Sequence, residues 1–440
     1  MNIVQITPGA GGMYCGNCFR DNALVGALRK MGHPTLMVPL YLPLTLDEAD
    51  NSAGTPLFFN GLNVYLEQKS AFFRNAPRWL HDVLGSPGLL KWAAGRAAKT
   101  RAADLGEITL SMLRAEEGNQ ARELNELIAW LKTQPRPDII FLSNALLVGL
   151  IRQMKSELRA PVICMLQGED TFLDALPESH RARCWQTIAE SAREADAFIA
   201  PSRYYGELMR RRLGLREDLV RVIYNGINLE GYPRPTGTDA RSAIAGEPVL
   251  GFFGRMCREK GLHLLIDAYL LLRKRDRVKG LKLRAGGGCG PSDRPFVQAQ
   301  RDKLKSAGVL PDAEFFPNLD RAAKLEFFRS LTLMSTPALY GEAFGLYIIE
   351  AMAAGVPVVQ PRHAAFPELL AATGGGVLCE PTPEALAESI EQLLLDPIAL
   401  GSIGEAGHKA VFQEFSVERM AEAVAAFGAQ ICASTQKSKT

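Results

Sequence analysis

The sequence predicts an α/β protein built from two doubly wound domains, each with a mainly parallel sheet. The chain has 440 residues, which is enough for two or three domains of ordinary size. Short apolar runs alternate with helical segments through both halves, the order that parallel sheets with crossover helices require. A stretch rich in proline and glycine at 231–237 lies between the halves and is the expected linker.

The first half opens with a βαβ unit. We expect a strand within Met1–Pro8, a glycine turn at Gly9–Gly12, a helix over Asn17–Met31 and a strand over Thr35–Leu40. The glycine turn lacks the third glycine that a dinucleotide fingerprint requires. Further strands of this half are predicted at 138–143, 162–166, 197–201 and 221–224.

The second half repeats this scheme. Its predicted strands are 248–253, 281–285, 314–316, 331–336, 356–360 and 376–379. A last helix is expected over Ser416–Cys432, followed by a frayed tail at 436–440.

The stretch 341–359 carries the most specific chemical signal. It places Glu342 and Glu350 eight residues apart, across a junction between a loop and a helix that begins near Leu346. Gly345 lets the loop approach a ligand closely. The N–H groups of residues 344–346 then point outward at a helix N-terminus, which is a natural anion site. This pattern suits an elongated ligand with a negative centre and hydroxyl-rich ends, such as a nucleoside diphosphate sugar.

A second motif lies about 90 residues earlier in the chain. A buried strand ends at Gly254 and is followed by Arg255, Lys260 and Gly261, after which an amphipathic helix begins at Leu262. Arginine supplies a planar fork of donors and lysine a point charge, so a glycine turn that presents both suits a diphosphate.

Together these motifs resemble the E-x7-E and G-R-x4-K-G elements of retaining GT-B glycosyltransferases of family 4, also called glycosyl transferases group 1. The resemblance implies two Rossmann-like domains that face a central cleft. Residues 1–230 would form the acceptor domain, with a helical insertion at about 43–137, and residues 231–410 the nucleotide-sugar donor domain. Residues 411–440 would form a helix that returns to the first domain.

The resemblance also implies a role for each residue of the motifs. Glu342 would contact hydroxyls of the donor sugar, and Glu350 would bind the ribose. Arg255 and Lys260 would neutralise the diphosphate and count, with Glu342, as the catalytic residues. The remaining donor-binding residues would be Gly11, Gly12, Gly254, Ala343, Phe344, Gly345 and Leu346.

One position departs from the family pattern. Many members have a histidine near the reacting sugar, where this chain has Gln167, followed by Glu169 and Asp170. Glutamine forms hydrogen bonds but carries neither charge nor a transferable proton. Either acidic residue could fill that place, and both could equally cap the helix that follows.

The implied activity is transfer of a sugar from a nucleoside diphosphate sugar to an acceptor hydroxyl, with a UDP-sugar as the first donor to test and no metal expected. The acceptor could be a glycan, a lipid or a small molecule. Two other activities remain open: a sugar-nucleotide 2-epimerase and a non-catalytic nucleotide-sugar-binding subunit. A glucan synthase-like enzyme is a further alternative, although the Lys-x-Gly-Gly-Leu loop of such synthases is absent.

Composition narrows the class of protein. Hydrophobic residues make up 47% and charged residues 22% of the chain, and the net charge is +2, so neither disorder nor nucleic-acid binding is expected. The N-terminus enters a strand without the pattern of a signal peptide, which predicts a cytoplasmic protein. Of the 8 cysteines, only Cys15 and Cys18 have a suggestive spacing, for which packing, redox and metal roles stay open.

The insertion allows three interpretations. It could supply core helices of an enlarged first domain, or it could form an acceptor pocket. Alternatively, its aromatic residues and nearby basic side chains could make a peripheral contact at the inner face of a membrane. These aromatic residues are Phe72, Phe73, Trp79 and Trp92.

Overall fold

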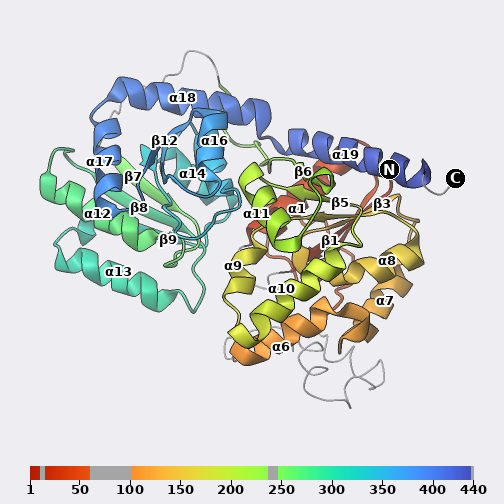
Figure 1. Cartoon of the computed structure of the whole chain (residues 1–440). Helices are drawn as coiled ribbons and strands as arrows, with labels where there is room; N and C mark the ends of the chain where they lie inside the picture. Colours follow the sequence, from red (N-terminus) through yellow and green to blue (C-terminus); the bar gives the residue numbers. More distant parts are fainter. Residues whose placement is uncertain (10–14, 60–101, 236–245, 438–440) are drawn as a thin grey trace. The chain divides into compact units, whose positions relative to one another are not determined.

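The computed structural model describes residues 1–9, 15–59, 102–235 and 246–437. The chain divides into two compact units, both drawn in Figure 1. Unit 1 comprises residues 1–223 and 420–440, and unit 2 comprises residues 224–419. The change of unit at 223/224 falls seven residues before the expected boundary at 230/231.

Unit 1 contains a six-stranded parallel sheet with the order β2-β1-β3-β4-β5-β6. The chain starts in the sheet interior and moves first to one edge and then to the other, so the sheet is doubly wound. Most strand residues are buried, as expected for a parallel sheet covered by helices on both faces. The strands are β1 (Ile3–Pro8), β2 (Thr35–Leu40), β3 (Ile139–Leu142), β4 (Val162–Met165), β5 (Ala197–Ala200) and β6 (Val220–Val222).

The helices of unit 1 include two from the predicted insertion. α6 packs against α10, and α7 buries an apolar face that contains Leu124, Leu127 and Leu131. The described part of the insertion therefore supplies core helices. Residues 60–101, with the four aromatic residues proposed for a membrane contact, lie outside the described residues. The described α-helices that lie wholly in unit 1 are α1 (Gly16–Lys30), α6 (Ala102–Leu113), α7 (Ala121–Leu131), α8 (Ile151–Leu158), α9 (Glu169–Asp174), α10 (Glu178–Ala192) and α11 (Arg203–Leu213).

Unit 2 repeats the architecture with the sheet order β12-β11-β10-β7-β8-β9, again parallel. β7 and β10 are neighbours, while the strands that follow each of them lie on opposite sides of the pair. This junction is the topological switch point of the sheet, where α/β proteins bind ligands beyond the carboxyl ends of the strands. The strands are β7 (Val249–Phe253), β8 (Lys282–Gly287), β9 (Ala313–Pro317), β10 (Leu333–Met334), β11 (Val358–Pro361) and β12 (Gly376–Cys379).

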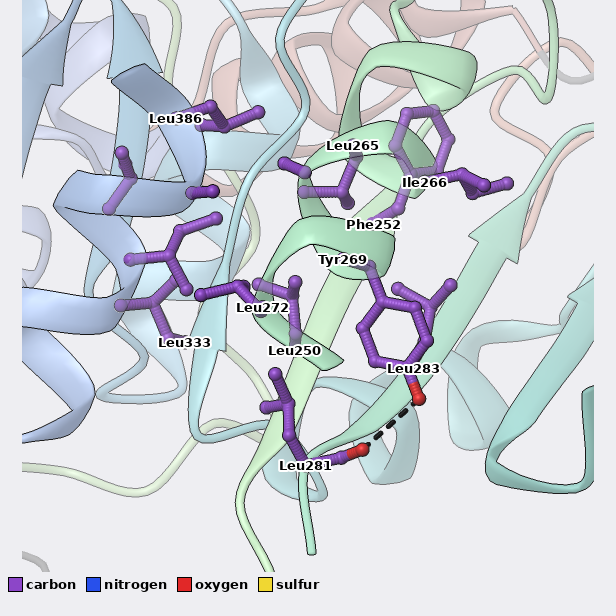
Figure 2. Close-up of a cluster of buried hydrophobic side chains, with 14 of the residues drawn as sticks. Leu250, Phe252, Leu265, Ile266, Tyr269, Leu272, Leu281, Leu283, Leu333 and Leu386 are labelled. Carbon is purple, nitrogen blue, oxygen red and sulfur yellow. Dashed lines mark hydrogen bonds between the residues drawn. The ribbon is translucent and has the colours of Figure 1, made fainter. Parts of the chain in front are cut away.

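Alternating strand residues of unit 2 belong to two separate cores, one on each face of the sheet. Leu333 of β10 packs in the first core and Met334 in the second, because successive side chains of a strand point to opposite faces. Figure 2 shows the first core, in which Leu250 and Phe252 of β7 lie against α12. There the buried hydroxyl of Tyr269 donates to the carbonyl of Leu281 at 3.1 Å.

The helices of unit 2 supply the other halves of these cores. Residues of α12 and α17 belong to the first core, and residues of α14, α15 and α16 belong to the second. The helices are α12 (Leu262–Arg275), α13 (Arg294–Ser306), α14 (Arg321–Arg329), α15 (Leu346–Ala353), α16 (Phe366–Thr373), α17 (Pro383–Leu394) and α18 (Pro397–Glu414).

The chain passes between the units twice, at 223/224 and at 419/420, and the segments of unit 2 next to these two crossings are hydrogen-bonded to each other. Ile227, just after the first crossing, donates to the carbonyl of Phe415 at 3.0 Å, and Val417 donates to the carbonyl of Ile227 at 2.8 Å. α19 (Val417–Lys437) begins in unit 2, and its residues from Met420 onward belong to unit 1. It is longer than the expected helix, which ended at residue 432.

One strand is much shorter than predicted. β10 has two residues where the sequence predicts a strand over 331–336, because the chain leaves the ladder after Ser335, whose N–H still donates to the carbonyl of Gly251 at 2.9 Å. The hydroxyl of Thr336 then replaces a ladder partner: it accepts from the N–H of Phe253 at 3.2 Å and donates to the carbonyl of Phe253 at 2.9 Å. Pro337 has no N–H with which to continue the ladder.

Candidate functional site

The candidate site lies at the carboxyl ends of β7 and β10. The loop after β7 carries Arg255 and Lys260, and the loop after β10 carries Glu342. Because β7 and β10 are paired neighbours, these two loops meet at one edge of the sheet although about 80 residues separate them in sequence. The structure thus brings both predicted motifs to the switch point of unit 2.

Gly261 fixes the contact between the two loops. Its φ of +78° lies in the left-handed region, and a Cβ at this position would stand 1.9 Å from the carbonyl oxygen of Pro337. The N–H of Leu339 also donates to the carbonyl of Glu259 at 2.8 Å. A glycine is therefore needed where the backbone after β7 passes the backbone after β10.

Glu342 is almost buried, and three donors converge on one of its oxygens. Oε2 accepts from the ammonium of Lys260 at 2.6 Å and from the hydroxyls of Tyr340 and Tyr347 at 2.9 Å each. The ammonium also lies 4.9 Å from the centre of each tyrosine ring. These contacts join the loops after β7 and β10 to the first turn of α15.

The surroundings of Glu342 keep it ionised. Burial by itself raises the pKa of this carboxyl, but the charge of Lys260 and the hydrogen bonds from Lys260 and the two tyrosines outweigh burial, so the pKa is lowered. Burial and the neighbouring carboxylate raise the pKa of Tyr347 well above its ordinary value, so its hydroxyl stays protonated and donates. The result is a fixed negative charge beside a fixed positive charge.

Arg255 is held by an acidic residue from the loop after β8. Its Nε and Nη2 donate to both carboxylate oxygens of Asp293 at 2.9–3.1 Å. The Asp293 side chain is 7% exposed, whereas that of Arg255 is 56% exposed. The buried carboxylate thus orients the guanidinium and leaves its other N–H groups exposed to solvent.

Glu350 lies one turn inside α15 and pairs with a cation that the sequence analysis did not select. Lys324, in the first turn of α14, donates to Oε1 of Glu350 at 2.8 Å, and the two side chains are 10% and 15% exposed. Both helices follow strands that end at the carboxyl edge, so this pair lies at the same edge of the sheet as Lys260.

The N-terminus of α15 is built as the sequence predicts. Gly345 is the N-cap with a φ of +97°, and the helix starts at Leu346. Its first N–H groups have no acceptor within the helix, which leaves them available to an anion. The side chains of Ala343 and Phe344 are buried in unit 2, so these side chains offer little surface to a ligand. Gly11 and Gly12 lie outside the described residues.

Four residues of this site were not selected from the sequence: Tyr340, Tyr347, Lys324 and Asp293. Tyr347 lies in an apolar helix, where the sequence pattern predicts that an aromatic residue packs in the hydrophobic core. Asp293 ends a glycine-rich loop, which by itself signals only a turn. For the two tyrosines, closeness to Glu342 in the chain was the one available signal.

The end of β4 in unit 1 holds a second buried acidic cluster. Glu169 accepts from the N–H of Ala145 at 2.7 Å and from the N–H of Gln167 at 2.8 Å. The hydroxyl of Tyr205 lies 2.8 Å from Glu169 and 2.9 Å from Asp170. Burial raises the pKa of both carboxyls. Glu169 therefore links the ends of β3 and β4, and Gly168, not Glu169 or Asp170, is the N-cap of α9.

Cys15 and Cys18 lie at the start of α1, where Cys15 is the N-cap residue. A hydrogen bond from the Cys18 thiol outweighs burial and lowers the pKa of Cys15 to about 7. Cys18 is buried and lies 3.1 Å from the carbonyl oxygen of Pro8, and its pKa is raised by Cys15 and by burial. Within the described parts of the chain, no three His, Cys, Asp or Glu side chains are arranged to hold a metal ion.

Comparison with known families identifies the class of protein. The family model described as glycosyl transferases group 1 matches residues 238–410, and the model of glycosyltransferase family 4 matches residues 92–230. The chain belongs to this family of GT-B glycosyltransferases and is an enzyme of the sugar-transferring class. The resemblance inferred from the two motifs is confirmed.

Curated relatives point to the same class. The chain is 27% identical to a D-inositol 3-phosphate glycosyltransferase of Nocardiopsis dassonvillei, over 69% of this chain and 70% of that protein. It is 31% identical to an alpha-maltose-1-phosphate synthase of Mycolicibacterium smegmatis, over 52% and 61%. A lipopolysaccharide core biosynthesis mannosyltransferase, LpsB of Rhizobium meliloti, is 29% identical over 47% and 59%. The latter two alignments span less than two thirds of those relatives.

Solved structures confirm the fold. A crystal structure of Anabaena HepE in complex with UDP matches with a TM-score of 0.69 and 18% identity, over 98% of this chain and 100% of that chain. A sucrose-phosphate synthase from Thermosynechococcus elongatus matches with a TM-score of 0.69 and 20% identity, over 98% and 99%. At these identities the likeness establishes the fold alone. None of the described helices combines the length and hydrophobicity needed to cross a membrane.

Proposed function

We propose that the protein is a retaining, metal-independent glycosyltransferase that moves a sugar from a UDP-sugar to an acceptor hydroxyl. The observation that carries this proposal is the contact between Lys260 and Glu342 at the junction of β7 and β10. An ionised carboxylate accepts hydrogen bonds from sugar hydroxyls, and an ammonium beside it binds a phosphate oxygen. A sugar phosphate presents these two groups next to each other.

The diphosphate would lie against the positive groups of this edge. The half-exposed guanidinium of Arg255, the ammonium of Lys260 and the first N–H groups of α15 are all aimed at fixed positions before any ligand arrives. Preorganised donors of this kind stabilise charge that develops on a leaving group, because they need no rearrangement during the reaction. They would carry the charge of the departing UDP.

The nucleoside would bind near Glu350, whose carboxylate accepts from ribose hydroxyls. UDP is the nucleotide in the complex of the similar Anabaena HepE fold, which makes it the first candidate donor nucleotide. Several relatives are named as transferases or synthases of phosphorylated polyols and sugars, so the acceptor search begins with that class.

The transfer step follows from the groups present. The acceptor oxygen forms a bond to the anomeric carbon while the bond from that carbon to the diphosphate oxygen breaks. The proton of the acceptor hydroxyl passes to the departing phosphate oxygen on the same face of the sugar, so the anomeric configuration is retained. This route needs no side-chain base, and Gln167 could not supply one.

Calorimetric titration tests the donor site directly. Wild-type protein is titrated with UDP, GDP and ADP, and then with their glucose, N-acetylglucosamine and mannose forms. We expect selective binding of UDP and one UDP-sugar, weakened about tenfold or more in Glu350→Ala because a hydrogen bond to a charged group is lost. Absence of binding to every member of this set contradicts the proposal.

Turnover separates the proposed transfer from its alternatives. We expect Glu342→Gln and Lys260→Ala each to abolish transfer while the protein stays folded, and NMR of the product to show the donor's anomeric configuration. Incubation of the donor alone serves as the control. An epimer formed without acceptor indicates a 2-epimerase, and tight binding without turnover on any acceptor indicates a binding subunit.

A further inference from the structure

We propose that Tyr340 and Tyr347 are positioning residues that hold Glu342 through Oε2, so that Oε1 becomes the oxygen that receives the donor sugar. This inference rests on the proposed function and concerns residues that neither the motifs nor the family assign. It makes the selection of the sugar depend on two tyrosine hydroxyls that lie behind the carboxylate.

The hydrogen-bond count on Glu342 is the first support. A carboxylate has about four lone-pair sites over its two oxygens. Oε2 already accepts from Lys260, Tyr340 and Tyr347 and is saturated. Oε1 accepts from no described residue. The carboxylate thus presents one saturated oxygen to the protein and one oxygen to a ligand.

The direction of the donors is the second support. Tyr340 lies in the loop before Glu342, and Tyr347 lies in the first turn of α15, so the two hydroxyls reach Oε2 from two different elements. A carboxylate held by donors from two elements cannot rotate about its last bond without breaking one of them. Rotation would exchange its oxygens, so the tyrosines fix which one is free.

The same rings also hold the cation. The ammonium of Lys260 lies 4.9 Å from the centre of each ring, within the range of a cation–π contact. Its one hydrogen bond to a described residue goes to Glu342, which leaves further N–H donors for a phosphate oxygen. The tyrosine pair therefore positions both charges that a sugar phosphate would meet.

The proposal predicts a selective kinetic effect. Tyr340→Phe and Tyr347→Phe keep both rings, and thus the contact with Lys260, but each removes one hydroxyl. We expect each variant to lose about tenfold or more in kcat/KM for the UDP-sugar that wild type uses, since a hydrogen bond to a charged group is lost. The affinity for UDP, which lacks the sugar, should stay within about twofold of wild type.

The pH profile provides a readout that a purely structural role would not move. The hydroxyls help to lower the pKa of Glu342, so their removal shifts the acid limb of kcat/KM to higher pH. Among the described residues, the titratable groups in contact with the Glu342 carboxylate are Lys260 and the two tyrosines. The Nε2 of His363 lies 3.3 Å from the carbonyl oxygen of Tyr340. Burial lowers the pKa of His363, so it is neutral around neutral pH.

Tyr269→Phe is the matched control, because it removes a buried hydroxyl from the same unit at a distance from Glu342 in the first core. It should leave KM and the acid limb unchanged. Wild-type kcat/KM and an unmoved acid limb in Tyr340→Phe, Tyr347→Phe and their double variant overturn the inference. If the wild-type protein does not bind UDP, the proposed glycosyltransferase function itself is wrong. UDP binding by the wild type therefore distinguishes a failure of the proposed function from a failure of the inference on the tyrosines.

Discussion

Replacing Lys260 by methionine tests whether the ion pair keeps Glu342 charged. Methionine has a similar length but no charge, so the 2.6 Å contact disappears while the packing is largely kept. Burial then opposes ionisation with only the tyrosine hydroxyls to offset it. We expect the pKa of Glu342 to move from below its ordinary value to above it.

The loss of stability in Lys260→Met can be estimated from the burial of the ion pair between Lys260 and Glu342. Removing one partner of a buried ion pair costs about 3–5 kcal/mol. The side chains of Lys260 and Glu342 are 20% and 11% exposed, so some water reaches them. We therefore expect a loss near the lower end, about 3 kcal/mol. For a domain of the size of unit 2, this loss lowers the Tm by roughly 6–12 °C.

The direction of the pKa shift determines how the Tm difference between wild type and Lys260→Met changes with pH. In the wild type the folded pKa of Glu342 lies below its unfolded value of about 4.5, so its stabilisation is complete above that pH and is lost as pH falls through the folded pKa. In Lys260→Met the folded pKa lies above the unfolded one, so stability falls as pH rises through it. The Tm difference between wild type and variant should therefore shrink on going from about pH 7 to about pH 5.

Thermal unfolding at both pH values measures this effect, and Lys303→Met is the control. Lys303 forms an ion pair with Asp267 in which the side chains are 43% and 33% exposed, and such surface pairs contribute only about 0–1 kcal/mol. The reasoning is refuted if Lys260→Met has the same Tm as Lys303→Met. It is equally refuted if the difference from wild type widens on acidification.

Two further predictions concern the loop contact and the cysteine pair. Gly261→Ala should lower the Tm of unit 2 more than the control Gly308→Ala. Both glycines have a positive φ, but of the two only Gly261 would place the added Cβ 1.9 Å from a backbone oxygen. Comparison of the melting curves of the two variants checks this prediction. The rate at which Cys15 is alkylated, followed by mass spectrometry, should reach half its maximum at about pH 7 in the wild type. In Cys18→Ala the half-maximal rate should require a clearly higher pH, because the hydrogen bond that lowers the pKa of Cys15 is lost. The same half-maximal pH in both proteins would contradict the hydrogen bond between the thiols.

Much of the fold could be predicted because local signals agree with the tertiary structure. β2 and β12 have the predicted bounds, and α12 begins at the predicted Leu262, since a glycine or proline directly precedes each of these elements. β10 was the exception: the predicted strand continues past Met334 through Ser335 and Thr336, but the hydrogen bonds between the Thr336 hydroxyl and the backbone of Phe253 take the chain out of the ladder. The hydrophobicity of a segment predicts that its side chains are buried, but it does not predict which backbone groups form hydrogen bonds with each other.

The candidate site was predictable only where a residue's role depends on its neighbours in sequence. Gly345 directly precedes a run of helix-forming residues, so its place at the start of the helix is visible in the sequence, and glycine adopts the left-handed conformation found there without strain. Lys324 has no such local mark: it is one of 50 basic residues, and its importance comes from Glu350, which is 26 residues away. The same holds for Glu169, whose bond to the N–H of Ala145 spans 24 residues.

Each cation of the candidate site is already paired with an acidic residue from a different element. Arg255 meets Asp293, Lys260 meets Glu342 and Lys324 meets Glu350. The edge of the sheet therefore combines three positive and three negative groups and avoids the large unpaired charge that would destabilise the ligand-free fold. A ligand that offers phosphate alone uses the remaining N–H donors of the cations and gives the carboxylates no new partners. A nucleoside diphosphate sugar also brings hydroxyl donors at both ends, so the carboxylates gain partners while the remaining N–H donors of the cations bind the phosphates. The paired charges thus favour a ligand that carries hydroxyls on each side of a diphosphate.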